Sequence, residues 1–329
     1  MHRSSPLLTR RQWLQTSAAA TAAFTAPGLL AQQYPARPMK VIVPFPPGGS
    51  ADVLTRVLVN AMGSTVGQPY VVDNKAGGGG ALGIQQTSAA APDGYTFGVT
   101  SLGPHVLLPQ LGRKLPYDPL KDIIPVGHMG GMGLAIIERN GLQAGSLADV
   151  IALAKAQPGK ISFGSSGIPG QLAIEQLKRM ADVDFLHVPY KGDTPMAADL
   201  IGGQIDLAML TVTATLPHME AKTFKVFATT GTSREEQMAS IPTVAEQGYP
   251  DFAAQLWYVL AAPAGTPENV IKTQSDALLK ALSTPEVNRQ FSLAGLYKSP
   301  MDTPTVQRFV NDEYKKWGSI IEKTGLRLE

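Results

Sequence analysis

Residues 41–52 read Val41-Ile-Val-Pro-Phe-Pro-Pro-Gly-Gly-Ser-Ala-Asp52, and this stretch decides how the chain begins to fold. A β-branched run ends in a turn rich in proline and glycine, and an amphipathic segment, Ala51–Met62, follows at once. This order predicts a strand, a tight loop and a helix start, because glycine lets backbone amides face outward. Free N–H groups and the positive end of the helix dipole favour an anion there. The stretch therefore predicts a small anion site.

Composition narrows the class of protein. A chain of 329 residues is long enough for two domains or one large one. Of its 28 basic residues three lie in residues 1–31, which hold no acid, so 25 remain against 26 acidic residues. Nucleic-acid binding needs a stripe of basic residues, and the sequence shows none, so we expect no nucleic-acid partner. The absence of cysteine excludes disulfides and cysteine-bound metals.

The N-terminus is typical of an export signal. Arg10 and Arg11 precede an alanine-rich segment that runs to Leu30, and we predict cleavage after Ala31. The paired arginines resemble a twin-arginine signal, and a Sec signal remains the alternative. Either signal leads out of the cytoplasm, so we expect an exported protein. After this segment the sequence has no run of eighteen or more apolar residues, so we predict no membrane span there.

Strand and helix patterns alternate along the rest of the chain, which predicts parallel sheets wound with crossover helices. Two long apolar stretches, Val126–Glu138 and Phe252–Ala262, are predicted to cross between two α/β lobes. We therefore divide the chain into an export signal (1–31), a first lobe (32–130 and 253–329) and a second lobe (131–252). Ligands of open α/β sheets bind at the carboxyl ends of strands, which places the site in the cleft between the lobes. Further predicted elements include a helix capped by Ser146 (Ser146–Ala156) and three C-terminal helices (Glu268–Leu282, Pro285–Ala294 and Thr303–Lys323).

Two glycine-rich motifs invite enzymatic readings. Gly78-Gly-Gly-Ala-Leu-Gly83 fits a dinucleotide-binding pattern, but it follows the second strand and lacks the acid expected about twenty residues on. We interpret it as a turn that lines the cleft. Gly164-Ser-Ser-Gly167 fails the nucleophile-elbow pattern because position 168 is Ile. We interpret it as a second anion site before a helix; a serine hydrolase that uses Ser166 and His187 remains the alternative of a different class.

Other polar and aromatic residues have two readings. The histidines of the mature chain show no metal-binding spacing, so we expect no metal and no cofactor. Asp52 either stabilises the first helical turn, with Ser50 as N-cap, or contacts an amine or hydroxyl of the ligand. Trp257 and Tyr258 are predicted to pack in the core or hinge, and Phe45 is better placed to meet a ligand.

Several motifs, in order and at compatible spacing, are similar to those of one family. They are Tyr34-Pro-Ala-Arg-Pro38, the Pro44–Asp52 loop, Pro92-Asp-Gly-Tyr95, Leu115-Pro-Tyr-Asp118, His187-Val-Pro-Tyr-Lys-Gly192, Asp199-Leu-Ile-Gly-Gly-Gln-Ile-Asp206 and Pro263-Ala-Gly-Thr-Pro267. The chain resembles the Bug family, the periplasmic substrate-binding proteins of tripartite tricarboxylate transporters, over essentially all of residues 34–329. The sequence departs from the family pattern at Gln171, where a histidine is usual, and at Leu210, where an acid is common.

The resemblance implies a two-lobed, Venus-flytrap fold of type II-like α/β architecture that closes on a small carboxylate. It implies a monomer without catalytic activity that delivers its ligand to membrane transporter subunits; a sensor for a signalling receptor is the alternative of the same fold. In the family, the loops at Gly48–Asp52 and Tyr190–Ala197 hold a ligand carboxyl group from opposite lobes. The predicted substrate-binding residues are Phe45, Pro47, Gly48, Gly49, Ser50, Asp52, Gly79, Ser101, Ser165, Ser166, Gly167, Tyr190, Gly192, Thr194 and Asp206.

Overall fold

The computed structural model describes residues 34–142 and 144–324. The chain divides into two units, Met1–Ala36 and Arg37–Glu329, and the account below concerns the described part of the second. The predicted export signal and its cleavage point lie outside the described residues. Within the described part, no helix combines the length and apolar character that a membrane span requires.

The first strand–loop–helix unit forms as predicted. β1 (Met39–Val43) pairs in parallel with β2 (Tyr70–Asn74) and with β3 (Thr96–Ser101), while α2 (Ser50–Val66) and α3 (Ala81–Ser88) connect them. Val41, Ile42 and Val43 of β1 are all buried, as expected for a parallel strand covered on both faces.

A second set of parallel strands repeats this arrangement. β5 lies between β6 and β7, and each neighbour pairs with it in parallel. The elements of this set are α5 (Leu147–Ala156), β5 (Ser162–Ser166), α6 (Gly167–Ala181), β6 (Leu186–Tyr190), α7 (Asp193–Ile201) and β7 (Leu207–Thr211). Helices and strands alternate through this set, as the sequence pattern predicts.

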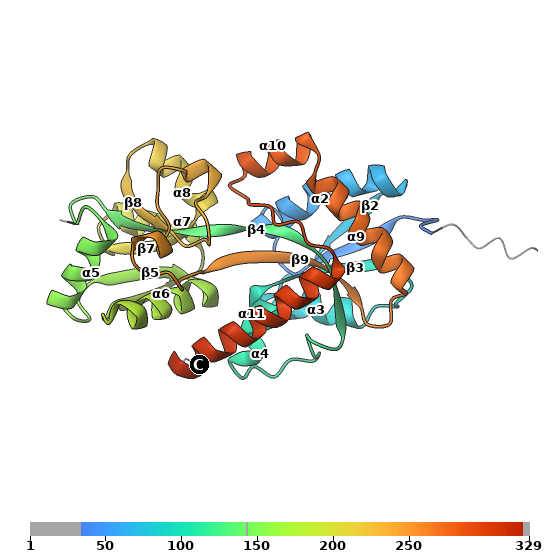
Figure 1. Ribbon diagram of the computed structural model, residues 1–329, viewed down its shortest axis with the longest axis horizontal. Coiled ribbons are helices and arrows are strands. Elements are labelled where there is room, and N and C mark those ends of the chain that lie inside the picture. Colours follow the sequence, from blue (N-terminus) through green and yellow to red (C-terminus); the bar gives the residue numbers. More distant parts are fainter. Residues whose placement is uncertain (1–33, 143, 325–329) are drawn as a thin grey trace, which may run out of the picture. The chain divides into compact units, whose positions relative to one another are not determined.

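Two long strands join the sets, and Figure 1 shows them running side by side. β4 (Ile123–Arg139) and β9 (Gln255–Pro263) are antiparallel to each other, and β8 (Phe224–Thr229) pairs with β4. The strand order is β2-β1-β3-β9-β4-β7-β5-β6. The strands that alternate with helices pair in parallel, as predicted, whereas β4 and β9 pair antiparallel with their neighbours, so the sheet as a whole is mixed.

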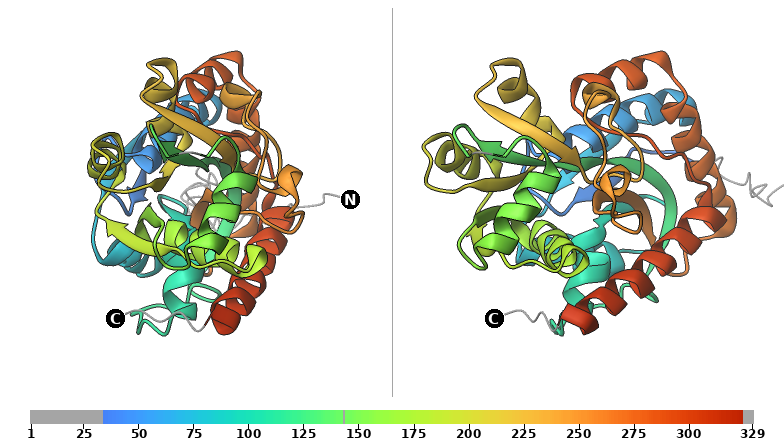
Figure 2. Two further views of the ribbon diagram at one scale, coloured as in Figure 1. Left: turned by 90° about the vertical axis from the view of Figure 1, so that its left-hand side faces the viewer. Right: turned by 60° about the vertical axis from the view of Figure 1, so that its left-hand side comes forward.

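Helices complete the fold. α11 passes close to α6 and β4 (Figure 2). The C-terminal helices are α9 (Glu268–Leu282), α10 (Pro285–Leu293) and α11 (Thr303–Thr324), as predicted to within a residue or two. Sequence reasoning missed α8 (Val212–Glu220), whose Pro217 argues against a helix. The short elements are η1 (Gly78–Gly80), η2 (Gly103–Leu107), α4 (Leu108–Gln110), η3 (Glu236–Met238) and η4 (Ala245–Gln247).

Two tryptophans anchor the main core. Trp257 of β9 is 1% exposed, which confirms the prediction that it packs inside, and Trp317 of α11 is fully buried. Both indole N–H groups donate to the same oxygen of Glu313, each at 3.0 Å. One carboxylate therefore satisfies both polar groups of the two largest buried side chains and fixes α11 against β9.

The helix cap at Ser146 gives a first testable prediction. Its Oγ accepts a hydrogen bond from the Asp149 amide at 3.2 Å, which confirms the predicted cap of α5. Ser146→Ala is expected to lower the free energy of unfolding by about 1 kcal/mol, because an amide of the first turn loses its partner. Urea denaturation measures this change. Ser64→Ala, on an exposed position of α2, is the control and should leave stability nearly unchanged; equal effects of the two changes would contradict the cap.

Candidate functional site

The loop after β1 presents backbone amides rather than charged side chains. Gly48 has φ +80°, a conformation that glycine adopts without the strain a side chain would bring. The N-cap of α2 is Gly49, and no side chain caps the helix. The prediction that Ser50 is the N-cap was therefore wrong: Ser50 is the first helical residue, and its hydroxyl is 2.9 Å from the Tyr258 hydroxyl. The first turn of α2 thus keeps amides for another acceptor.

Asp52 anchors this loop. It is 3% exposed and accepts hydrogen bonds from the Gly48 amide (2.9 Å), the Asn74 amide group (2.9 Å) and Arg56 Nε (3.0 Å). Burial would raise the pKa of Asp52, but the hydrogen bonds from Arg56, Gly48 and Asn74 hold it below the ordinary value. Because both carboxylate oxygens are occupied, the structure favours the structural role of Asp52 over contact with a ligand.

The start of α7 is arranged in a similar way. Its N-cap is Gly192, with φ 143° and no side-chain cap. The Asp193 carboxylate accepts hydrogen bonds from Thr211 Oγ1 (2.6 Å) and the Thr211 amide (3.3 Å), so it does not satisfy the first amides of α7. Burial raises the pKa of Asp193, and the hydrogen bonds from Thr211 oppose the rise only in part.

The two helix starts open on one cavity of about 300 Å³, the lower end of the range for small-ligand sites. The lining residues come from the loop after β1 and the start of α2, from β4, from the start of α7, from the end of β7 and the start of α8, and from the chain after α10. They are Gly48, Ser50, Val53, Met132, Asp193, Thr211, Thr213, Ala214, Ala294 and Leu296. Sequence reasoning had named Gly48 and Ser50 and had included Asp193 in the loop Tyr190–Ala197, but it missed Thr211.

Phe45 and Ser101 lie outside the cavity lining and contact Tyr258, whose hydroxyl meets the lining residue Ser50. The Phe45 ring meets the Tyr258 ring edge-on, with 6.4 Å between centroids, and Ser101 is the β-ladder partner of Tyr258. Pro47 and Gly49 are exposed on the loop itself. Gly79 packs against Leu108, in the turn before α3. The predicted ligand-binding residues between positions 45 and 101 thus cluster around the Ser50–Tyr258 pair, apart from Gly79.

The predicted ligand-binding residues between positions 165 and 206 lie in different places, some near the cavity and some away from it. Gly192 borders the cavity through Asp193, and Tyr190 donates a hydrogen bond to Asp199 at 2.7 Å. Burial and this hydrogen bond raise the pKa of Tyr190 to about 12. Ser166 is the N-cap of α6, Gly167 is its first residue, and no side chain caps this helix either. Thr194 is exposed.

A hydrolytic role for Ser166 gains no support from the geometry. The His187 Nε2 atom is 2.8 Å from the Ser165 hydroxyl, so His187 pairs with the neighbouring serine. Ser165 is only 1% exposed, which leaves no room for a substrate at its oxygen. A nucleophile needs both a base and access to substrate, and neither serine combines them here.

Asp206 lies at the opposite end of β5 from these residues. Its carboxylate accepts hydrogen bonds from the Ser162 amide (3.0 Å) and hydroxyl (2.8 Å), and from Arg139 Nε (2.9 Å). Burial would raise the pKa of Asp206, but these hydrogen bonds hold it below the ordinary value. Asp206 ties the start of β5 to the end of β4, and we leave it out of the site. Among residues 34–142 and 144–324, no group of three or more histidine or acidic side chains is placed to hold a metal.

The mixed sheet and the cavity at the carboxyl ends of β1, β6 and β7 are the architecture of two-lobed periplasmic solute-binding proteins. The chain belongs to the TctC family, the tripartite tricarboxylate transporter family receptors, whose family model matches residues 54–326. This confirms the family and the fold class predicted from the motifs.

Individual relatives agree with this assignment. The chain is 34% identical to Protein BugT of Bordetella pertussis over 94% of its own length and 96% of that protein. Its fold matches R. palustris Rpa4515, solved with adipate, at a TM-score of 0.79 and 29% identity, over 89% and 99% of the two chains. It also matches MatC from Rhodopseudomonas palustris, solved with bound malate, at a TM-score of 0.73 and 27% identity, over 88% and 100%.

Proposed function

We propose that this protein binds a small organic carboxylate between the loop after β1 and the start of α7. The observation that carries the proposal is the shared cavity, on which two helix N-termini without side-chain caps open. Oriented amides bind an anion without flexible charged side chains and without the entropy cost of ordering them. Arg56 offsets the charge of Asp52 beneath the loop, which lowers the repulsion that an incoming carboxylate would meet.

The cavity wall favours a ligand that carries a hydroxyl group besides its carboxylate. Asp193 is the acidic side chain of the lining, and its carboxylate can accept a hydrogen bond that a ligand hydroxyl donates. Leu210 does not shape this wall, because it is fully buried in the core around β7. The structural relatives solved with adipate and malate support a carboxylate as the ligand class.

The family description indicates that ligand binding serves transport. We propose that the chain is exported, captures its ligand in the periplasm and passes it to the membrane subunits of a tripartite tricarboxylate-type transporter. In this proposal the lobes comprise residues 32–130 with 253–329, and residues 131–252. β4 and β9 would then be the connections about which they close, as hinge closure around a ligand requires.

Thermal unfolding in the presence of candidate ligands tests the proposal. The screen compares malate with succinate, which differ by one hydroxyl, and includes adipate, other di- and tricarboxylates, aromatic acids and amino acids. We expect at least one carboxylate to stabilise the protein, by roughly 2.7 kcal/mol at about 100 times its dissociation constant. Malate is expected to bind more tightly than succinate. A screen in which no carboxylate raises the unfolding temperature would contradict the proposed function.

A further inference from the structure

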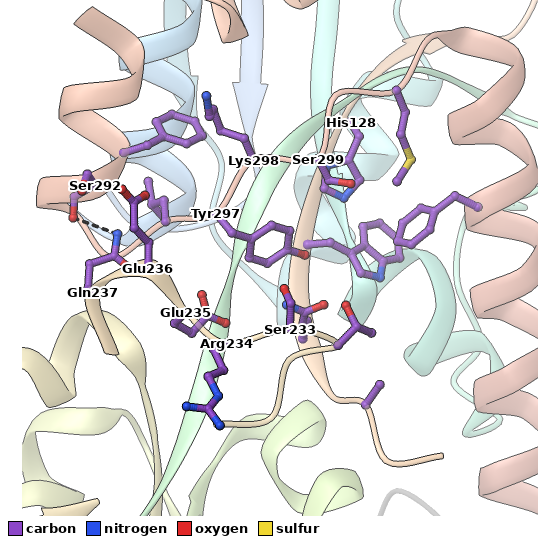
Figure 3. Close-up of a pocket in the computed structure, with 18 of the residues that line it drawn as sticks. His128, Ser233, Arg234, Glu235, Glu236, Gln237, Ser292, Tyr297, Lys298 and Ser299 are labelled. Carbon is purple, nitrogen blue, oxygen red and sulfur yellow. Dashed lines mark hydrogen bonds between the residues drawn. The ribbon is translucent and has the colours of Figure 1, made fainter. Parts of the chain in front are cut away.

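A second and larger cavity, of about 860 Å³, lies apart from the proposed carboxylate site. It is enclosed by the segment Thr232–Gln237, the start of β9, the chain from Asn288 to Met301 and one side of α11 (Figure 3). Its lining shares only Leu296 with that of the smaller cavity. The proposed function gives it no role.

Glu235 is a buried carboxylate on the wall of this cavity. Glu235 is 4% exposed, and its Oε1 atom has no hydrogen-bond partner in the part of the chain that the structure describes, while the Gln255 side chain hydrogen-bonds the carboxylate. A Cβ at Gly133 would lie 2.1 Å from Oε1, and a Cβ at Gly131 would lie 2.7 Å from the Tyr297 hydroxyl. The glycines of β4 therefore make the space in which these two polar groups sit. A buried acceptor without a partner costs free energy unless something binds it.

Most of the charged groups around Glu235 pair with residues other than Glu235. The neighbouring cations pair as Arg234–Glu246, Arg289–Glu286 and Lys316–Glu313, and Lys298 hydrogen-bonds the Asn288 side chain. His128 carries no charge, because burial lowers its pKa to about 4. Glu236 is exposed, and Glu313 accepts from both tryptophans. Within residues 34–142 and 144–324, Glu235 thus lies on the cavity wall and forms no ion pair with the cations that line it.

Aromatic rings line the same cavity. Phe309 packs edge-on against His128, with 5.2 Å between centroids, and against Trp257, at 5.5 Å. The Tyr297 ring also lies near His128, with 6.2 Å between centroids. The faces of aromatic rings attract ammonium groups, and a nearby carboxylate adds to that attraction in a site with little water.

We propose that this cavity binds a small organic cation of the ammonium class, with Glu235 as its counter-ion. The alkyl groups of the cation would lie against the rings of Tyr297 and Phe309. The proposed cation site shares one lining residue, Leu296, with the smaller cavity.

Calorimetric titration and thermal unfolding with choline chloride at about pH 8.5 test the inference on the full mature chain. The matched probe is dimethylbutanol, in which carbon replaces the charged nitrogen of choline. Saturable binding of choline is expected, at least tenfold tighter than that of dimethylbutanol. Glu235→Gln should weaken choline binding tenfold or more. Glu220→Gln, at the exposed end of α8 and outside the cavity lining, should bind choline as the wild type does.

The pH dependence gives a second readout. Choline does not titrate, so its affinity should fall as the pH is lowered from about 8.5 to about 5.5, following the protonation of a buried acid whose pKa lies near 7. Arg234, Glu236, Arg289, Lys298, Glu313 and Lys316 line the same cavity. Burial raises the pKa of Tyr297 and lowers that of His128, so both side chains stay neutral over this range. No choline binding, equal binding of dimethylbutanol, or unchanged affinity in Glu235→Gln would overturn the inference. None of these results bears on the carboxylate site, because no probe carries a carboxylate.

Discussion

Replacing Asp52 with alanine is expected to lower the free energy of unfolding by about 2–3 kcal/mol and to weaken carboxylate binding at least tenfold. The change leaves Arg56, Asn74 and the Gly48 amide without their common acceptor. Breaking a buried, hydrogen-bonded ion pair typically costs about 3–5 kcal/mol. The cost is lower here because the Arg56 side chain is 51% exposed and can turn to water. Binding weakens because the loop loses the bond that fixes the Gly48 amide.

Asp73→Ala is the matched control for this prediction. Asp73 lies on the neighbouring strand β2 and forms ion pairs with Lys40 and Lys75, but it is partly exposed. Its loss should cost less than about 1 kcal/mol and leave binding unchanged. Chemical denaturation and calorimetric titration of both variants decide the point. If Asp52→Ala and Asp73→Ala behave alike, Asp52 does not anchor the loop.

Neutralising Glu235 is expected to remove a large pH dependence of stability. Burial raises the pKa of Glu235 from 4.5 to about 7, and its hydrogen bond with Gln255 offsets only part of the rise. The folded state therefore holds the proton more tightly than the unfolded state does. The resulting stabilisation is complete below about pH 4.5 and is lost as the pH rises through 7, a change of about 3 kcal/mol.

Denaturation curves of wild type and Glu235→Gln, measured between about pH 5 and pH 8.5 without organic cations, test this prediction. The stability of the wild type relative to the variant should fall steadily over that range. Comparison with the variant removes the contributions of Asp193 and Glu138, whose pKa values burial also raises. Glu236→Gln should follow the wild type. Parallel curves for wild type and Glu235→Gln would show that Glu235 keeps an ordinary pKa.

Local features of the site could be predicted from the sequence because they depend on neighbouring residues. The glycines after β1 and the amphipathic segment behind them specify a strand, a loop and a helix start within about twenty residues. The cap at Ser146 follows from a serine three residues before an acid. The ordered motifs identified the family before any contact was known.

Contacts between distant segments could not be predicted in this way. Ser50 meets Tyr258 across 208 positions, and this contact, rather than capping, decides the role of the serine. Asp193 and Thr211 line the same side of the proposed carboxylate cavity because β6 and β7, which precede or contain them, flank β5 in one sheet. Asp206 has the residue type of a binding group, yet its place at the other end of β5 gives it Arg139 and Ser162 as partners.

The second cavity depends on packing that leaves little trace in the sequence. Glu235 is one of several acids in a polar segment, and only the fold shows that it is buried. Gly131 and Gly133 look like weak points in a strand, but each keeps clear the space next to a polar group on another segment.

The most direct test of carboxylate binding compares one acid with its amide. The tightest carboxylate from the thermal screen and its primary amide, which is neutral and nearly the same shape, are titrated calorimetrically into the wild-type protein. Amides at the starts of α2 and α7 favour the charged oxygen, so the acid should bind at least about tenfold more tightly. Equal affinities for the acid and the amide would contradict the proposal that these helix starts hold a carboxylate.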